Sequence, residues 1–258
     1  MKISIIGSGN MAHFVALSFQ EKGHKVHQIY SRNLQNAQKL AAKCQAEAVT
    51  KIEEIHTDID ALFLLINDTA IAEIALHPHL SNCFLVHCAG SQPIDLLHPT
   101  LRSCAVIWPI YSIHKEQPPI NQSIPLIIES SSEKAQDTTL SLAHVLSDNV
   151  TILDFSQREK LHLSAVMSNN FINHLLNMNQ SYLGKEGLDS NLLKPIIKQT
   201  FENHMNAANL IPQTGPAARG DSKTIAHHLQ LLENHPELYD LYKSMSKAIS
   251  NYYLKKEL

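Results

Sequence analysis

Two glycines and an alanine stand near the N-terminus at a spacing that suits the binding of a phosphate group. The segment Gly7-Ser8-Gly9-Asn10-Met11-Ala12 has the pattern Gly-x-Gly-x-x-Ala and follows a short apolar run, Ile3 to Ile6. The first glycine permits a tight turn, the second lets the backbone approach a pyrophosphate, and the alanine lets a helix pack closely against a strand. The N–H groups at the start of that helix then face the phosphates. The segment predicts a dinucleotide site that includes Gly7, Ser8, Gly9, Asn10 and Met11.

The residues after the second apolar strand, Lys25 to Tyr30, indicate which dinucleotide is bound. Proteins that bind NAD usually have Asp or Glu there, which hydrogen-bonds the ribose 2′-hydroxyl. This chain has Ser31, Arg32 and Asn33 instead. A hydroxyl, a guanidinium and an amide suit a 2′-phosphate, which an acid would repel. We therefore expect NADP (NADPH) as the cofactor, and the alternative is that Arg32 is a solvated surface residue.

Two further segments are expected at the carboxyl edge of the same sheet, where a dinucleotide crosses. One follows the apolar run Ala61 to Ile66, and its Asp68 either contacts the cofactor or caps the next helix. The other follows the run Cys83 to His87, and its small side chains either let a nicotinamide approach the backbone or form an ordinary turn. The candidate contacts are Ile66, Asn67 and Asp68 at the end of the first run, and Cys88, Ala89 and Gly90 after the second.

The second half of the chain carries polar side chains on a helix that is otherwise apolar. Residues 156–183 predict one long helix whose apolar residues cover most of its circumference. Five polar side chains fall within an arc of about 100° on an ideal 3.6-residue wheel. They either line a substrate cleft or form a structural network, because buried amides and imidazoles need partners. The five are His162, Asn169, Asn170, Asn173 and Asn177.

A loop rich in glycine and proline precedes the second-last predicted helix. Thr214 to Asp221 contains two glycines and a proline, which predict a tight, exposed turn. Arg219 at its tip is either solvated or an anion clamp, and Asp221 can cap the helix that follows. Histidine titrates near physiological pH, so His162 is the candidate proton donor. The candidate catalytic residues are His162, Asn169, Asn170, Asn173, Arg219 and Asp221.

A sheet and a set of helices must position these groups. Apolar runs that alternate with helical segments predict an α/β domain with a mainly parallel sheet over residues 1–153. Beyond residue 153 no strand is expected, so residues 154–258 form an all-helical domain. A helix that is apolar nearly all round also needs cover, which a second subunit would supply in part. The strands are expected at 3–6, 25–30, 61–66, 83–87, 104–108, 124–129 and 150–153, and the helices at 11–22, 34–43, 156–183, 189–210, 221–233 and 236–256.

Composition argues against several classes of protein. The 258 residues are 44% hydrophobic and 17% charged, so a substantial core can form. A formal net charge of -3 without a long basic run argues against nucleic acid as a partner. No apolar stretch has the length of a signal peptide or membrane span, so we expect a cytoplasmic protein. The 16 histidines lack metal-binding spacing, and no metal is expected. Cys44, Cys83, Cys88 and Cys104 are expected to be small core residues.

Several of these segments carry a resemblance to a known family. His162 to Asn170, Thr200 to Asn203 and Thr214 to Asp221, with His228-Leu229 after them, resemble bacterial Rossmann-like proteins with a DUF2520 C-terminal domain. The resemblance covers the whole chain, and the Gly-Pro-x-x-Arg-Gly-Asp run is its most specific part. That group is similar to pyrroline-5-carboxylate reductase, F420-dependent NADP reductase and 6-phosphogluconate-dehydrogenase-like proteins. The resemblance implies a Rossmann domain, a helical C-terminal domain, a homodimer and an NADP cleft between the domains.

Two departures from the related families bear on the chemistry. β-Hydroxyacid dehydrogenases have a lysine three residues before the Asn-Asn pair, where this chain has Val166, and His162 is the candidate substitute. Trp108-Pro109 stands where the DUF2520 pattern has His-Pro. One expected function is an NADP(H)-dependent oxidoreductase that reduces a small C=N or C=O substrate by hydride transfer. The alternative is a non-enzymatic, NADP(H)-binding redox sensor. An intact fingerprint argues against a pure scaffold.

Overall fold

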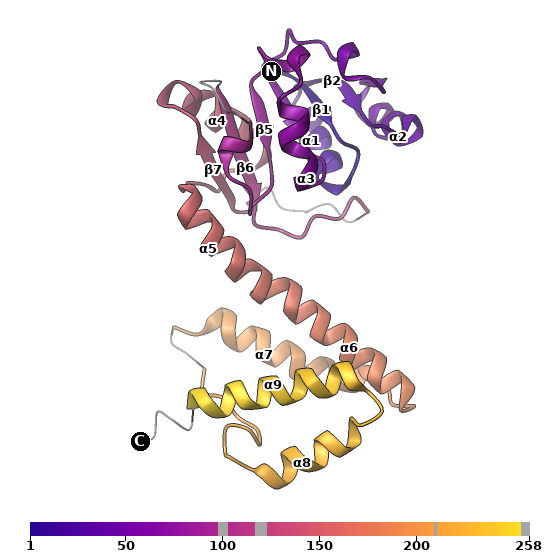
Figure 1. Ribbon diagram of the computed structural model, residues 1–258, viewed down its shortest axis with the longest axis vertical. Helices are drawn as coiled ribbons and strands as arrows, with labels where there is room; N and C mark the ends of the chain where they lie inside the picture. The colour runs from indigo at the N-terminus through magenta and orange to yellow at the C-terminus, as the bar shows by residue number, and fades with distance from the viewer. Residues whose placement is uncertain (98–102, 117–122, 209–210, 254–258) are drawn as a thin grey trace. The chain divides into compact units, whose positions relative to one another are not determined.

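The chain divides into two compact units, Met1–Asn169 and Asn170–Leu258 (Figure 1). The division is seen in a computed structural model that describes residues 1–97, 103–116, 123–208 and 211–253. Within those ranges, the first unit contains a sheet with its helices and the second contains helices. The last strand ends at Ile152, but the first unit continues to Asn169 because a further helix packs against the sheet. The domain boundary expected after residue 153 stays a prediction.

The first unit is built on one eight-stranded sheet with the order β3-β2-β1-β4-β5-β6-β7-β8. Adjacent strands pair in parallel except β6 and β7, which are antiparallel. The mainly parallel sheet is therefore confirmed. The sequence misses β3, because its three residues, Glu47-Ala48-Val49, are not part of a continuous apolar run. The strands are β1 (Lys2–Ile6), β2 (Lys25–Tyr30), β3 (Glu47–Val49), β4 (Ala61–Leu64), β5 (Leu85–His87), β6 (Cys104–Pro109), β7 (Leu126–Ser130) and β8 (Val150–Ile152).

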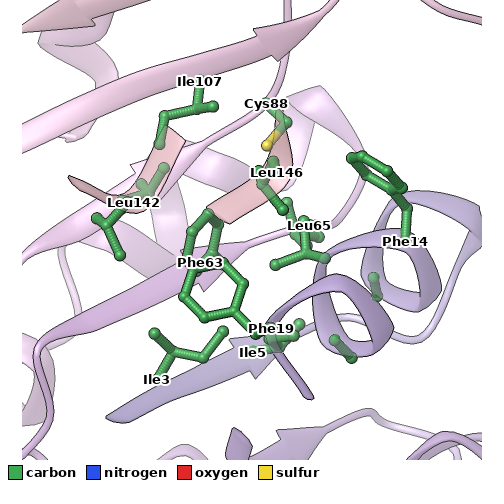
Figure 2. Packing of buried hydrophobic residues seen from close by; sticks show 14 of the residues in the cluster. Ile3, Ile5, Phe14, Phe19, Phe63, Leu65, Cys88, Ile107, Leu142 and Leu146 are labelled. Atoms are coloured by element: carbon green, nitrogen blue, oxygen red, sulfur yellow. The ribbon is translucent and has the colours of Figure 1, made fainter. Parts of the chain in front are cut away.

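Helices cover both faces of this sheet, because the strands are apolar on both sides. On one face, α1 (Asn10–Glu21), α2 (Leu34–Cys44) and α4 (Glu133–Leu146) share a core cluster with the strands. Figure 2 shows Phe19 and Phe63 meeting in this cluster, with ring centroids 5.7 Å apart. On the other face, α3 (Asp68–Ala75) packs on residues such as Leu62 and Leu64. The four cysteines are buried, as predicted.

The helix α5 (Phe155–Ala165) packs against the sheet at β6 and β7. Its Leu161 and Ala165 pack against a third cluster formed by Val106, Trp108 and Ile127 of β6 and β7. Asp154 caps this helix by accepting a hydrogen bond from the Gln157 backbone N–H at 2.8 Å. The contacts of Leu161 and Ala165 therefore anchor α5 to the sheet.

The expected single helix over 156–183 is interrupted. A π-helical segment, Val166–Phe171, separates α5 from α6 (Ile172–Lys185). A π turn closes with i→i+5 hydrogen bonds and holds one residue more than an α turn, which rotates the residues after it relative to those before it. The assumption of one regular helix was therefore wrong. The remaining helices are α7 (Lys194–Asn206), α8 (Ser222–Leu231) and α9 (Pro236–Tyr253), and the expected helical residues 209–210 and 254–256 lie outside the described residues.

The second unit has almost no core of its own. Among its described residues only Ala217, Leu232 and Ser246 are buried. Large apolar side chains are exposed instead, including Leu192 at 75% and Met205 at 83%. The burial expected for the apolar helix over 156–183 is thus not reached within one chain. No helix in the described part of the chain is long and apolar enough to cross a membrane.

Candidate functional site

A cavity of about 700 Å³ lies at the point where the order of the strands reverses, between β1 and β4. Parallel sheets bind ligands at such switch points, outside the carboxyl ends of the strands. Two predicted cofactor residues, Asn33 and Gly90, are not part of the lining. The predicted residues that do line it are Gly7, Ser8, Gly9, Asn10, Met11, Ser31, Arg32, Ile66, Asn67, Asp68, Cys88 and Ala89.

Sequence reasoning missed a second group of lining residues, which are mostly apolar. Ala70, Ile71 and Ile74 come from one side of α3, and their helical spacing was a usable signal. Ile52 lies in a short helical turn after β3, and nothing in its sequence surroundings points to the cavity. The other members of this group are Ile6, Tyr30, Leu64, Leu65 and Glu73.

The two glycines of the fingerprint are needed for different reasons: the fold requires Gly7, whereas Gly9 leaves space in the cavity. Gly7 has φ +130°, and a Cβ there would collide with the carbonyl oxygen of Leu65. Its backbone N–H donates to the Tyr30 carbonyl at 2.9 Å, so the turn is held between strands. Gly9 has φ -82°, and a Cβ there would meet no atom within 4 Å. The folded chain therefore tolerates a side chain at Gly9, and only a ligand in the cavity would need the space.

The N-terminus of α1 opens into this cavity. Its N-cap, Gly9, provides no side-chain cap, and the first turn contains no acidic residue. The first N–H groups of a helix have no partner within the helix, and they carry the positive end of its dipole. Gly9, Asn10 and Met11 all line the cavity. This end of the cavity therefore fits a phosphate group.

The turn after β2 lines the cavity with a hydroxyl and a guanidinium. The Ser8 hydroxyl donates to the Ser31 hydroxyl oxygen at 3.2 Å, which joins this turn to the glycine turn. Arg32 is exposed, and it is the one lysine or arginine among the described lining residues. Asn33 serves the fold, because its side chain accepts from the Asn36 backbone N–H at 3.3 Å and caps α2. Arg32 therefore supplies the positive charge where the turn after β2 meets the cavity.

Asp68 does not cap α3, contrary to one of the two alternatives. The N-cap of α3 is Asn67, and Asp68 occupies the first helical position. Its carboxylate accepts hydrogen bonds from the Ser91 hydroxyl at 3.3 Å and from the Gln92 side-chain amide at 3.4 Å. Asp68 therefore joins the turn after β4 to the loop after β5.

His87 ends β5 and is fully buried. Burial and the positive charge of Arg158 lower the pKa of His87 to about 4, so the imidazole is neutral at physiological pH. Its Nδ1 accepts from the Ala89 backbone N–H at 3.1 Å, which leaves the proton on Nε2. Burial also raises the pKa of the neighbouring Cys88 thiol. Neither side chain is suited to exchange protons with a ligand near neutral pH.

Sequence reasoning missed Arg158, the largest of the fully buried side chains. Its Nη1 donates to the carbonyl oxygens of Ala89 at 3.1 Å, Gly90 at 2.8 Å and Gln92 at 2.8 Å. Its Nη2 donates to the Glu129 carboxylate of β7 at 2.7 Å. A lone arginine early in a polar stretch of helix normally indicates a solvated residue, so no signal in the sequence points to this contact.

His162 lies one helical turn after Arg158 and packs beside Gly90. A Cβ on Gly90 would come within 2.7 Å of the His162 ring and 2.5 Å of the Trp108 ring. The centroids of the His162 and Trp108 rings are 5.4 Å apart. Residue 90 must therefore be glycine for these rings to fit. The imidazole is partly buried and lies beside the loop whose first residues, Cys88 and Ala89, line the cavity.

The other predicted catalytic residues are divided between the π segment and the second unit. Asn169 and Asn170 both lie within the π segment, on the two sides of the boundary between the units, and Asn173 follows on α6 in the second unit. The arc of an ideal wheel thus does not describe their arrangement relative to His162. Their convergence with His162 on one substrate pocket stays a prediction.

Arg219 and Asp221 lie in the glycine-rich loop of the second unit. Asp221 caps α8, as expected, by accepting from the backbone N–H of Thr224 at 3.1 Å and from its hydroxyl at 2.7 Å. These bonds from Thr224 lower the pKa of Asp221. No group of three or more His, Cys, Asp or Glu residues in the described parts of either unit is arranged to hold a metal ion.

Two family models match different parts of the chain. Residues 2–87 match a family described as "NADP oxidoreductase coenzyme F420-dependent". Residues 124–249 match "Domain of unknown function (DUF2520)". No curated protein sequence matches the chain.

Solved structures match nearly the whole chain. A "putative NADP oxidoreductase" from Bacteroides fragilis is 30% identical, with a TM-score of 0.88 over 97% of this chain and 98% of that protein. An imine reductase from Myxococcus stipitatus in complex with NADP+ is 14% identical, with a TM-score of 0.66 over 98% of this chain and 100% of that one. A pyrroline-5-carboxylate reductase from Coxiella burnetii is also 14% identical, with a TM-score of 0.57 over 98% and 97% of the two chains. The last two likenesses show a shared fold.

Alanine at the two fingerprint glycines is expected to separate folding from ligand binding. Gly7→Ala places a side chain on a residue with positive φ and makes it collide with Leu65. The free energy of unfolding should fall by about 1–3 kcal/mol or more, and the melting temperature should fall with it. Gly9→Ala should leave the melting temperature unchanged and abolish NADPH binding, because the methyl group fills space that only a ligand needs. Thermal denaturation and fluorescence titration check the pair. Tight NADPH binding by Gly9→Ala would show that the cavity is not the cofactor site.

Proposed function

The chain belongs to the family of the Bacteroides fragilis protein, and on this basis we propose that it is an NADPH-dependent reductase. Its own first half is Rossmann-like, and its second half matches the DUF2520 model. The substrate is a small molecule with a C=N or C=O bond. One observation carries the proposal. The cavity at the switch point joins an uncapped helix N-terminus, an unobstructed Gly9 and a basic residue, Arg32, in the places where a dinucleotide phosphate needs them.

Different residues of the cavity bind different parts of the cofactor. Gly9, Asn10 and Met11 hold the pyrophosphate through backbone N–H groups of α1. Ser31 and Arg32 bind the 2′-phosphate of the adenosine half. The nicotinamide half then extends toward Cys88 and Ala89, the lining residues after β5. When bound, NADPH supplies a hydride, so the chain itself needs to supply only orientation and a proton.

His162 is the residue that we assign as the proton donor. It is the partly buried histidine beside Gly90, and Gly90 directly follows the lining residues Cys88 and Ala89 toward which the nicotinamide half extends. The buried and neutral His87 is excluded from this role by its pKa of about 4. Asn169, Asn170 and Asn173 orient the substrate, and Arg219 and Asp221 complete the pocket, where Arg219 holds an anionic group.

A second candidate function rests on Val166. An apolar residue occupies the position three before Asn169, where β-hydroxyacid dehydrogenases have a lysine. This absence favours a protein that binds NADP(H) and senses redox state without catalysis. The two functions share the cofactor site and differ only in whether a substrate is reduced.

We further propose that the protein is a homodimer held together by its C-terminal helices. A helical unit must bury an apolar stripe to be stable, and this unit leaves its large apolar residues exposed within one chain. The exposed residues lie on successive helices and include Phe171 at 62%, Leu192 at 75%, Ile196 at 60% and Met205 at 83%. A second copy presents the same apolar residues in return, as an isologous interface requires.

The cofactor proposal predicts a preference for NADPH over NADH. A charge-assisted hydrogen bond to a phosphate contributes about 1.5–3 kcal/mol, so the preference should be at least about tenfold. Arg32→Ala should remove most of it by weakening NADPH binding alone. Lys39→Ala, an exposed change on α2 outside the cavity, is the matched control. Fluorescence titration measures both affinities. Equal affinities in the wild-type protein would refute the assignment of Ser31 and Arg32.

The catalytic proposal predicts that His162→Asn slows reduction by about 10²–10⁴-fold, the usual effect of losing a general acid. NADPH affinity should be unchanged. The substrates to test are small cyclic imines and small ketones, with NADPH oxidation followed by absorbance. His144→Asn, an exposed substitution on α4, is the control. Wild-type protein that binds NADPH but reduces none of these compounds would favour the sensor. A full rate with His162→Asn would exclude His162 as the acid.

The dimer proposal predicts twice the monomer mass in light scattering at micromolar concentration. Ile196→Glu should produce monomers or unfolded protein, because it places a charge in the interface. Leu76→Glu in the first unit is the matched control, because Leu76 is 58% exposed and Ile196 is 60% exposed. A monomeric wild-type protein would refute the proposal, and so would a variant Ile196→Glu that remains a stable dimer.

A further inference from the structure

The loop Ala89–Gln92 is held in place by Arg158, and we propose that this arginine is a positioning residue for the nicotinamide half of the cofactor. The inference rests on the proposed function, because it takes the cavity to be an NADPH site. It adds a residue that neither touches the cavity nor belongs to the fingerprint. Arg158 acts through the backbone of the loop that follows β5.

The contacts of Arg158 are aimed at backbone atoms of one short loop. One terminal nitrogen donates to three carbonyl oxygens within four residues, those of Ala89, Gly90 and Gln92, at 2.8–3.1 Å. The other donates to Glu129 on β7, which holds the guanidinium in one orientation. The planar fork of arginine fits such a set of acceptors, and the point charge of lysine does not. The loop is thus clamped to β7 and α5 together.

A buried ion pair is not explained by stability alone. The cost of removing two charges from water often equals or exceeds their attraction, and apolar side chains of similar volume stabilise a core at least as well. The Arg158 Nε also has no hydrogen-bond partner within the described residues, which adds a further cost. What the arginine contributes is a fixed geometry for the carbonyl groups of the loop.

The clamp also determines where the N–H groups of this loop point. In a trans peptide the N–H is antiparallel to the C=O of the same unit, and the described chain has no cis peptide bonds. The carbonyls of Ala89 and Gly90 face Arg158, so the N–H groups of Gly90 and Ser91 point away from the guanidinium. Neither N–H has a hydrogen-bond partner among the described residues. Neither residue lines the cavity, so the two donors would meet a ligand only where it extends past Ala89, the last lining residue of this loop.

The same helix face connects the loop to the proposed acid. Arg158 and His162 are four residues apart on α5, so their side chains lie on one face. The first binds the carbonyl of Gly90, and the second lies against the Cα side of the same glycine. On the opposite flank, Asp68 accepts from the side chains of Ser91 and Gln92. Arg158 therefore fixes the distance between the loop beside the nicotinamide and the helix that carries His162.

The experiment compares a ligand that reaches this loop with one that does not. NADPH spans the whole cavity, whereas adenosine 2′,5′-bisphosphate lacks the nicotinamide half and occupies only the part from Ser31 and Arg32 to the glycine turn. Arg158→Met and Arg158→Lys should weaken NADPH binding by about tenfold or more, with Lys recovering only part of the affinity. Binding of the bisphosphate should be unchanged in both variants. Fluorescence competition at a temperature well below the melting point measures both ligands.

Two controls separate positioning from a general loss of stability. Lys160→Met changes an exposed residue of the same helix, and it should alter neither affinity. Leu142→Ala opens a cavity under α4, in a different core cluster from the one that α5 contacts, and should lower the melting temperature without changing the ratio of the two affinities. If Arg158→Met does not fold, Arg158→Lys and Glu129→Gln give the comparison.

The outcomes distinguish this inference from the function on which it rests. Selective weakening of NADPH supports the positioning role. Equal weakening of both ligands, or no weakening of NADPH, overturns it while the cofactor site stands. Wild-type protein that binds neither ligand contradicts the proposed function and this inference together.

Discussion

The carbonyl oxygen of Leu65 occupies the space where a side chain on residue 7 would lie, and the site depends on this close approach of two backbones. It brings the end of β1 against the end of β4, where the Leu65 N–H donates to the Ile6 carbonyl at 2.7 Å. From this turn α1 leaves over one face of the sheet, while α3 leaves over the other after β4. The cavity exists because the two helices diverge there. A glycine at position 7 is thus a condition for the fold and for the site together.

The electrostatics at the far end of the cavity depend on one buried cation. Arg158 is neutralised by Glu129 and is surrounded by carbonyl oxygens, while its charge helps to keep His87 unprotonated. Cys88 also stays protonated, since burial disfavours its thiolate. The residues that follow β5 therefore present a neutral environment with fixed dipoles. Such preorganised dipoles stabilise a charge that changes during a reaction without needing to rearrange.

The features that could be predicted from the sequence are those that depend on residues close together in the chain. Apolar runs located seven of the eight strands, and the glycine spacing of residues 7–9 placed the cavity. The antiparallel pairing of β6 and β7 and the buried role of Arg158 were not predictable, because both depend on partners distant in sequence. Asp68 shows the same limit: its position before a helix suggests a cap, but its partners Ser91 and Gln92 lie in another loop. The arc of polar residues assumed a regular helix through Val166–Phe171, and that assumption was wrong because the interruption depends on more than the local pattern.

The π segment has a consequence for how relatives are aligned with this chain. Its hydrogen-bonded turn contains one residue more than a turn of α-helix, so sequence distance and helical surface position disagree across it. When a relative with a regular helix at this point is superposed on this chain, one residue of the π segment has no counterpart in the relative. Val166 begins the segment, and so its alignment with the lysine of β-hydroxyacid dehydrogenases holds by residue count but not by position on the helix surface. Equivalent residues in this part of the family have to be identified by superposition.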